Sequence, residues 1–263
     1  MARFPGQELA NILLNSVMRW LIGSQPTIIK EHTCTLIQIG VGHLQKVQVR
    51  QATRDTTYPV YISEPLVIAS LSGLFDNDAW SKRKEWFTNY LNLHTTKQGF
   101  GYAFEDAMLF VVMESFGGKY TALGDVFHFS DKSPLKSREV TLVSLMRMDD
   151  GEIFTSNVEW HSRSSPRLGF KAGTHEDVVR FFTNPCGTTF LFPDTRMGPD
   201  LIFFVKDKET GELMMVVVQI KATPNVSWLV ALQSITPDFF YSMIVRVSFF
   251  ITYCRTDILM QCM

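Results

Sequence analysis

Three polar residues, Asp200, Gln219 and Lys221, interrupt two apolar segments that flank a charged turn. The segments Leu201–Val205 and Leu213–Ile220 are rich in residues that favour β-strands. A glycine in the turn tolerates the positive φ that tight hairpins require. The stretch therefore predicts a β-hairpin. Its polar residues need an explanation, because burying a carboxylate or an ammonium group costs free energy.

Alternation along the strands gathers these polar groups in either of two pairings. If Thr210–Gly211 forms the loop, Asp200 lies opposite Lys221. If Glu209–Thr210 forms the loop, Asp200 lies opposite Gln219 instead. Gln219 and Lys221 share one face because side chains alternate along a strand. Both registers therefore predict one cross-strand cluster.

A helix expected over Tyr102–Phe116 carries a further acid, Glu105. At about 100° per residue, Glu105 falls between Val112 and Phe116 in an apolar stripe, whereas Asp106 falls on another side. An unpaired carboxylate in such a stripe is costly, which indicates a partner or a ligand for it. The alternative is an acid in the first helical turn, which the helix dipole favours by about 0.3–1 kcal/mol.

Together these residues resemble the PD-(D/E)XK nuclease superfamily. Pro199–Asp200 match the PD element, Gln219–Lys221 match the (D/E)xK element, and Glu105 matches the core-helix Glu. Over about residues 55–245, the wider pattern resembles the nuclease-like domain of Crinkler and retrotransposon-hot-spot-type proteins. Its cues are Ile62–Leu71, Gly101–Glu105, Val216–Ala222 and Ala231–Tyr241. The resemblance implies a restriction-endonuclease-like fold, with a helix–strand–strand–strand–helix unit on a mixed sheet flanked by helices.

Three departures from the family pattern bear on activity. Gln219 stands where the family more often has an acid. The long interval from Glu105 to Asp200 implies an insertion around residues 125–170, in which Glu139–Met146 is strand-like. The resembled proteins often carry an upstream P-loop NTPase, but the sequence contains no GxxxxGK[ST] motif. We therefore expect an upstream NTPase module to be absent from this chain.

The residue types suit metal-dependent phosphodiester hydrolysis. Mg²⁺ or Mn²⁺ polarises the phosphate and lowers the pKa of the attacking water, and one or two carboxylates suffice to hold Mg²⁺. We expect Asp200 as the principal ligand, Glu105 as the second and the Ile220 carbonyl as a third. Gln219 would offer a neutral amide oxygen, and Lys221 would orient the nucleophile or stabilise phosphorane charge. Alternatively, Asp200 and Lys221 form only a structural ion pair that closes the hairpin.

Length and composition set the expected domain organisation. With 263 residues, of which 46% are apolar and 13% aromatic, the chain is long and apolar enough to bury a core. We expect residues 97–263 to form the α/β nuclease-like domain. Residues 1–96 are interpreted as a smaller, mainly helical part and a remnant of a larger upstream module; the order of its elements fits a winged-helix-like module, and other arrangements fit as well.

Charge and targeting signals restrict the partners. The formal net charge of −1 gives no overall basic signal, so a nucleic-acid partner requires a local patch. Arg163, Arg167 and Lys171 lie in a stretch without acids and could contact phosphates, although short basic loops are often merely solvated. The sequence has no CxxC motif and no signal peptide, so we expect an intracellular protein, in the cytoplasm or in the nucleus. Charges interrupt Met243–Met263, so we expect no membrane span.

Three function classes remain open from the sequence. The first is an active nuclease on DNA or RNA, and the second is a degenerate nuclease fold that binds nucleic acid or acts as an effector or interaction domain. The third is a structural α/β interaction domain whose polar hairpin is only a buried ion pair. The sequence does not set the oligomeric state.

Overall fold

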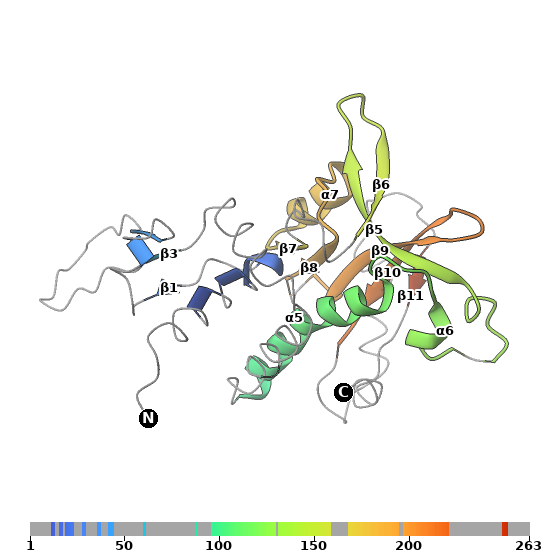
Figure 1. The fold of residues 1–263 in the computed structure, drawn as a ribbon, viewed down its shortest axis with the longest axis horizontal. Helices are drawn as coiled ribbons and strands as arrows, with labels where there is room; N and C mark the ends of the chain where they lie inside the picture. Colours follow the sequence, from blue (N-terminus) through green and yellow to red (C-terminus); the bar gives the residue numbers. More distant parts are fainter. Residues whose placement is uncertain are drawn as a thin grey trace, which may run out of the picture. The chain divides into compact units, whose positions relative to one another are not determined.

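The computed structural model describes residues 12–13, 16–17, 19–23, 28–29, 36–37, 42–44, 60–61, 88, 96–129, 131–158, 168–194, 197–220 and 249–251. The chain divides into two compact units, Met1–Trp86 with Arg163–Ser165, and Phe87–Ser162 with Pro166–Met263. Figure 1 shows the helices and strands of both units. No helix among the described residues combines the length and the apolar character that crossing a membrane requires.

The first unit contains a small antiparallel sheet. Its strands are β1 (Ile28–Ile29), β2 (His43–Leu44) and β3 (Val60–Tyr61), and β3 lies between the other two. Helical residues are described between positions 12 and 21. Most of the expected N-terminal helices, and with them the winged-helix-like order, lie outside the described residues.

The second unit is built on a mixed sheet, of which the structure describes eight strands. They are β4 (Thr121–Ala122), β5 (Glu139–Arg147), β6 (Ile153–Asn157), β7 (Gly169–Ala172), β8 (Phe190–Pro193), β9 (Leu201–Asp207), β10 (Leu213–Val218) and β11 (Phe249–Ile251). The main order is β11-β10-β9-β5-β4, with β6 paired to β5 and with β7 joined to β9 through β8. β10–β11 and β7–β8 are parallel, and the other pairs are antiparallel. The expected α/β class with a mixed sheet is therefore confirmed.

Strand β9 organises this sheet because both of its edges are paired. β10 follows one edge along its whole length, from Leu213 opposite Lys206 to Val218 opposite Leu201. The other edge is shared between β5 and β8. β5 includes the strand-like segment Glu139–Met146, so a segment within the range expected for the insertion supplies a neighbour of β9.

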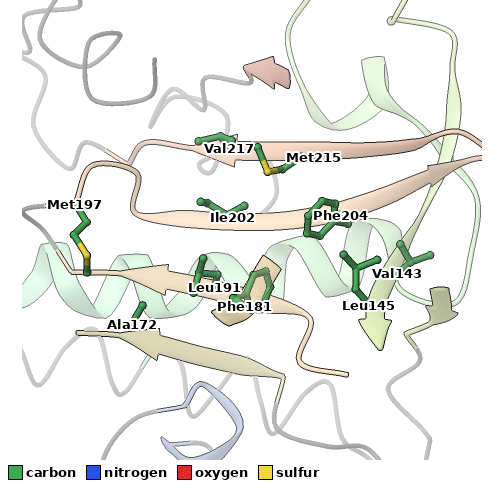
Figure 2. Packing of buried hydrophobic residues seen from close by; sticks show 10 residues of the cluster. All are labelled: Val143, Leu145, Ala172, Phe181, Leu191, Met197, Ile202, Phe204, Met215 and Val217. Carbon is green, nitrogen blue, oxygen red and sulfur yellow. The ribbon is translucent and has the colours of Figure 1, made fainter. Parts of the chain in front are cut away.

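Two helices cover opposite faces of the sheet. They are α5 (Lys97–Phe116) and α7 (His175–Thr183), while α6 (Leu123–Val126) is a single turn between β4 and β5. α7 contributes Phe181 to a core cluster whose other members are Val143, Leu145, Ala172, Leu191, Met197, Ile202, Phe204, Met215 and Val217. Figure 2 looks onto this cluster, and α5 passes behind the strands. The sheet is thus a middle layer between α5 and α7.

The β9–β10 hairpin adopts one of the two registers that the sequence allowed. Continuing the ladder past Leu201 and Val218 places Asp200 opposite Gln219. The register with a Thr210–Gly211 loop is therefore wrong. The predicted antiparallel pairing of the two segments is confirmed.

The turn explains this choice of register. The Asp207 N–H donates to the Glu212 carbonyl (2.9 Å), which closes a four-residue loop instead of a two-residue one. The Asp207 carboxylate accepts the backbone N–H groups of Glu209 (2.9 Å) and Thr210 (2.8 Å). Gly211 has a φ of 70°, a left-handed conformation that glycine adopts without strain. These contacts need the longer loop, so they fix the pairing along the whole hairpin.

Candidate functional site

Asp200 lies where the chain bends into β9. Gly198, two residues earlier, has a φ of 107°, a conformation that other residues rarely adopt. The Asp200 N–H donates to the Val218 carbonyl (3.0 Å), which ties the residue to the end of β10. Because Asp200 is only 9% exposed, its carboxylate is held largely inside the protein.

Two N–H donors from the end of β10 bind the Asp200 carboxylate. Oδ2 accepts hydrogen bonds from the Gln219 side-chain amide and from the Ile220 backbone N–H. Gln219 and Ile220 are both buried. The ladder ends at Val218, so the carboxylate provides an acceptor for a backbone N–H that lies beyond the ladder. The Asp200 and Gln219 side chains thus lie together, as the observed register requires.

The Gln219 amide presents its nitrogen, rather than its oxygen, to Asp200. A role as a neutral oxygen ligand would require the amide to turn. In the observed arrangement, Gln219 orients the carboxylate. Lys221, Arg163 and Arg167 lie outside the described residues, so their predicted roles stay predictions.

Helix α5 is apolar on nearly all sides, which changes the interpretation of its acids. Its buried apolar side chains are Ala103, Phe104, Ala107, Met108, Leu109, Phe110, Val112, Met113 and Phe116. A helix of this kind is enclosed in a core and has no single buried stripe. Glu105 is half-buried, whereas Asp106, expected away from the apolar stripe, is only 5% exposed. The more deeply buried acid is therefore the one that the sequence pattern passed over.

Asp106 pairs with Lys171 of β7. Lys171 Nζ lies 2.8 Å from Asp106 Oδ1 and 5.8 Å from the centre of the Phe192 ring. The sequence placed Lys171 in a basic loop without acids, whereas the structure places it in a strand beside an acid of α5. Sequence reasoning missed this pair because its members are 65 residues apart. The all-round apolar character of α5 is the signal that could have marked Asp106.

The strand register places this ion pair near the end of the sheet that holds Asp200. Lys171 pairs with Phe192, and extending the β8–β9 register by one residue brings Phe192 level with Leu201. Leu201 directly follows Asp200. Helix α5, which carries Glu105 next to the ion pair, therefore reaches the same end of the sheet.

The turn end of the hairpin carries a different group of charges. Arg138 lies 3.8 Å from Asp207, and Lys208 lies 2.5 Å from Glu139. The backbone N–H of Thr210 holds the pKa of Asp207 below its ordinary value. The hydrogen bond to Glu139 raises the pKa of Lys208. These charged groups pair with one another and stabilise the turn, so their presence needs no bound ligand as an explanation.

The donor set at Asp200 suits only an ion that needs few protein ligands. Among the described residues, no group of three or more His, Cys, Asp or Glu side chains could hold a metal ion. A site at Asp200 would rely on one or two carboxylates, a backbone carbonyl and water. Mg²⁺ commonly accepts such a set, because it keeps several waters and prefers oxygen ligands.

Comparisons with known proteins leave this site to be interpreted from its own residues. No protein-family model matches the chain, and neither a curated protein nor a solved structure matches it.

Proposed function

We propose that this chain is a metal-dependent nuclease that hydrolyses phosphodiester bonds, with Asp200 as the principal ligand of Mg²⁺ or Mn²⁺. One observation carries the proposal. Asp200 is a buried carboxylate whose Oδ2 is fixed by two N–H donors at a strand end. A carboxylate that is held in this way keeps one orientation, which a metal ligand requires. Rigid strands also set the geometry of a ligand before the ion binds.

The order of the elements supports the same proposal. α5, β5, β9 and β10 come in the order helix, strand, strand and strand, with β4 and α6 between α5 and β5 and with β6, β7, α7 and β8 between β5 and β9. β5, β9 and β10 are also neighbours in the sheet. β11 runs parallel to β10, and such a connection needs a crossover of about a dozen residues or more. Residues 221–248 supply that length, so we infer a restriction-endonuclease-like core.

The residues present fit a hard divalent cation with few protein ligands. Asp200 would supply the first oxygen, the Ile220 carbonyl and Glu105 further ones, and water the remainder. A cation bound there polarises the phosphate and lowers the pKa of water. Gln219 keeps the Asp200 carboxylate oriented, and Lys221 would stabilise the negative charge that develops on the phosphate.

Nucleic acid is the partner that this chemistry implies. Arg and Lys side chains provide many of the phosphate contacts in such complexes. The Lys171 ammonium is engaged by Asp106. Phosphate contacts are therefore assigned first to Arg167, which lies in the same compact unit as Asp200.

One observation favours a second candidate, a nuclease fold that binds nucleic acid without cleaving it. The Gln219 amide donates to the Asp200 carboxylate, which stabilises the carboxylate even without a cation. A Glu at position 219 would instead repel Asp200 unless a cation lay between them. The two candidates therefore predict different effects of replacing Gln219 by Glu.

Replacing Asp200 by Asn tests the first candidate. The purified full-length chain is titrated with Mn²⁺ by calorimetry and incubated with supercoiled plasmid or single-stranded RNA. Asp200→Asn should lose both Mn²⁺ binding and cleavage, because a neutral amide replaces a charged ligand of the same shape. Asp207→Asn removes a second buried carboxylate from the far end of β9 and should retain both activities. If Asp200→Asn binds Mn²⁺ as the parent does, the nuclease proposal fails.

Replacing Gln219 by Glu separates the two candidates. In an active nuclease the parent already cleaves, and Gln219→Glu should bind Mn²⁺ more tightly because a charged oxygen replaces a neutral amide. In a binding module the parent retards nucleic acid in a gel without cutting it. Cleavage that appears only in Gln219→Glu supports the second candidate.

A further inference from the structure

Strands β5 and β6 form a hairpin that projects beyond the other strands of its unit (Figure 1). Hydrogen bonds close its turn. The Met148 N–H donates to the Glu152 carbonyl (2.8 Å), and the Gly151 N–H donates to the Met148 carbonyl (2.9 Å). The Glu152 N–H donates to Asp150 Oδ1 (2.9 Å). The projecting end is therefore a regular hairpin with defined faces and edges.

The outer edge of β6 is open. Among the described residues, β6 pairs with β5 alone. The Arg147 N–H of β5 donates to the Pro185 carbonyl (2.9 Å), on the side of β5 away from β6. Its partner in the ladder, Ile153, therefore directs its own N–H and C=O away from β5. Thr155 does the same, because this orientation repeats at every second residue of an antiparallel strand. The backbone groups of Ile153 and Thr155 form what we call the open edge.

Apolar side chains are exposed beside the open edge. Met146 lies opposite Phe154, and Met148 shares their face of the hairpin because side chains alternate along a strand. Met148 is 51% exposed and Phe154 is 39% exposed, while Ile153, on the other face, is 50% exposed. Methionine side chains adapt to partner surfaces of varied shape. The sequence of β6, Ile-Phe-Thr-Ser-Asn, also lacks the charges and prolines that commonly protect an edge strand.

The end of the hairpin is negatively charged. Residues 147–157 contain one base and three acids, a net charge of −2, and these are Arg147, Asp149, Asp150 and Glu152. All three acids are exposed. The Arg147 guanidinium donates to the Thr183 carbonyl (2.7 Å), so it is directed to the end of α7. A partner that lies along β6 thus meets a negative potential, and positive charge on that partner favours both approach and binding.

We propose that the open edge of β6 binds an extended, basic segment of another protein by strand addition. The backbone of the segment forms hydrogen bonds with the open edge, which supplies affinity, and its alternate side chains supply specificity. An apolar side chain of the segment contacts Met148 and Phe154, and its Lys or Arg side chains lie near Asp149 and Glu152. This binding surface does not depend on metal binding at Asp200.

Charge favours such a segment over a second copy of this chain. Two β6 strands paired antiparallel through their open edges, about Phe154 or Thr155, would set residues 149–152 beside residues 156–161 of the copy. That stretch contains one acid, Glu159, and neither lysine nor arginine. A parallel pair would set the acids of the two copies side by side. A second copy therefore brings no cation to the acidic turn in either direction.

Fluorescence anisotropy with the full-length chain tests the binding. The probe is a labelled peptide of alternating valine and threonine with lysines at both ends, so either strand direction brings positive charge to the acids. The matched control peptide has glutamates in place of the lysines. The lysine peptide should bind at least about tenfold more tightly, because several exposed charge pairs change from attraction to repulsion. The difference should shrink at high salt.

A proline in β6 tests the role of the open edge. Thr155→Pro removes an N–H from the open edge and leaves the β5–β6 hydrogen bonds in place, because they do not use that N–H. It should weaken binding of the lysine peptide at least about tenfold, whereas Thr155→Ala keeps the N–H and should bind as the parent does. Circular dichroism checks folding, and Ile153→Pro with its control Ile153→Ala replaces this pair if Thr155→Pro is unfolded.

Removing charge tests the role of the acids. Asp149→Asn combined with Glu152→Gln should weaken the lysine peptide about threefold to tenfold. The proposal is overturned if the parent does not bind the lysine peptide, if it binds both peptides equally, or if the folded proline variant binds as the parent does. A dimer of the parent in sedimentation that the proline variant loses would also overturn it, because the open edge would then belong to a second copy.

Discussion

Replacing Asp207 by Asn removes the charge that closes the β9–β10 turn. Oδ1 of Asp207 accepts the N–H groups of Glu209 (2.9 Å) and Thr210 (2.8 Å), and Oδ2 lies 3.8 Å from Arg138 Nε. The side chain is 4% exposed, so water cannot readily replace these partners. Loss of the charge should therefore weaken the turn measurably.

The size of the effect follows from the two hydrogen bonds. A hydrogen bond to a charged group contributes about 1.5–3 kcal/mol and a neutral one about 0.5–1.5 kcal/mol. Asp207→Asn keeps both bonds in neutral form, so the free energy of unfolding should fall by about 2–3 kcal/mol. Asp207→Ala loses both bonds and should cost about 3–6 kcal/mol. Glu209→Gln makes the same charge change at an exposed position and should stay within about 0.5 kcal/mol of the parent.

The effect should also depend on pH in one direction. The pKa of Asp207 in the folded protein is lowered below the unfolded value of about 3.9, chiefly by the N–H of Thr210. The N–H of Glu209 and the Arg138 guanidinium act in the same direction. A lowered folded pKa gives stability that is fully present above the unfolded pKa. That stability is lost as the pH falls from about 3.9 through the folded pKa. The gap between the parent and Asp207→Asn should therefore be constant from neutral pH to about pH 5 and should shrink below about pH 4.

Urea unfolding followed by circular dichroism at several pH values measures this gap. The parent, Asp207→Asn and Glu209→Gln are compared at each pH, and the slopes of the transitions are checked for equality. Equal stability of the parent and Asp207→Asn at neutral pH would refute the account of the turn. A gap that stays unchanged down to about pH 3 would refute the assignment of the effect to the charge of Asp207.

Two further predictions concern α7 and the core cluster that it covers. Thr174→Ala removes the capping box at the start of α7, where the Thr174 hydroxyl accepts the Asp177 N–H (3.2 Å), and should cost about 1 kcal/mol in chemical denaturation. Leu191→Ala opens a cavity at a side chain that is 0% exposed and should cost about 2–5 kcal/mol. In the same assay, Ile153→Ala, at a residue that is 50% exposed, should change stability by less than about 0.5 kcal/mol.

The hairpin could be predicted from sequence because its signals are local. Two runs of strand-forming residues around a glycine-containing turn specify antiparallel pairing. The register could not be chosen, because the charged turn offers two loops that look equally good in sequence. The choice depends on the Asp207 carboxylate, which binds two backbone N–H groups and needs a four-residue loop to do so. The sequence does not distinguish Asp207, which the fold buries, from the exposed charged residues beside it.

The acids of α5 show a different limit. A helical wheel identifies a buried acid only where the helix has one apolar side, and α5 is apolar nearly all round. Asp106 and Glu105 therefore could not be ranked by periodicity. Lys171, the partner of Asp106, belongs to a segment that sequence patterning assigned to a loop, because β7 is only four residues long. Neighbours that are 65 residues apart and that helix-on-sheet packing brings together leave no local trace in the sequence.

The parallel pairing of β10 with β11 has a consequence for how the chain folds. The β9–β10 hairpin forms from residues close in sequence, whereas β11 is synthesised only after residues 219–248. Local contacts form faster than distant ones, so β10 passes through a period with an open outer edge. Its sequence, Leu-Met-Met-Val-Val-Val, contains no charge or proline to discourage another chain from pairing there. The strand that leads into Gln219 and Ile220 is thus also open to misassembly before the sheet is complete.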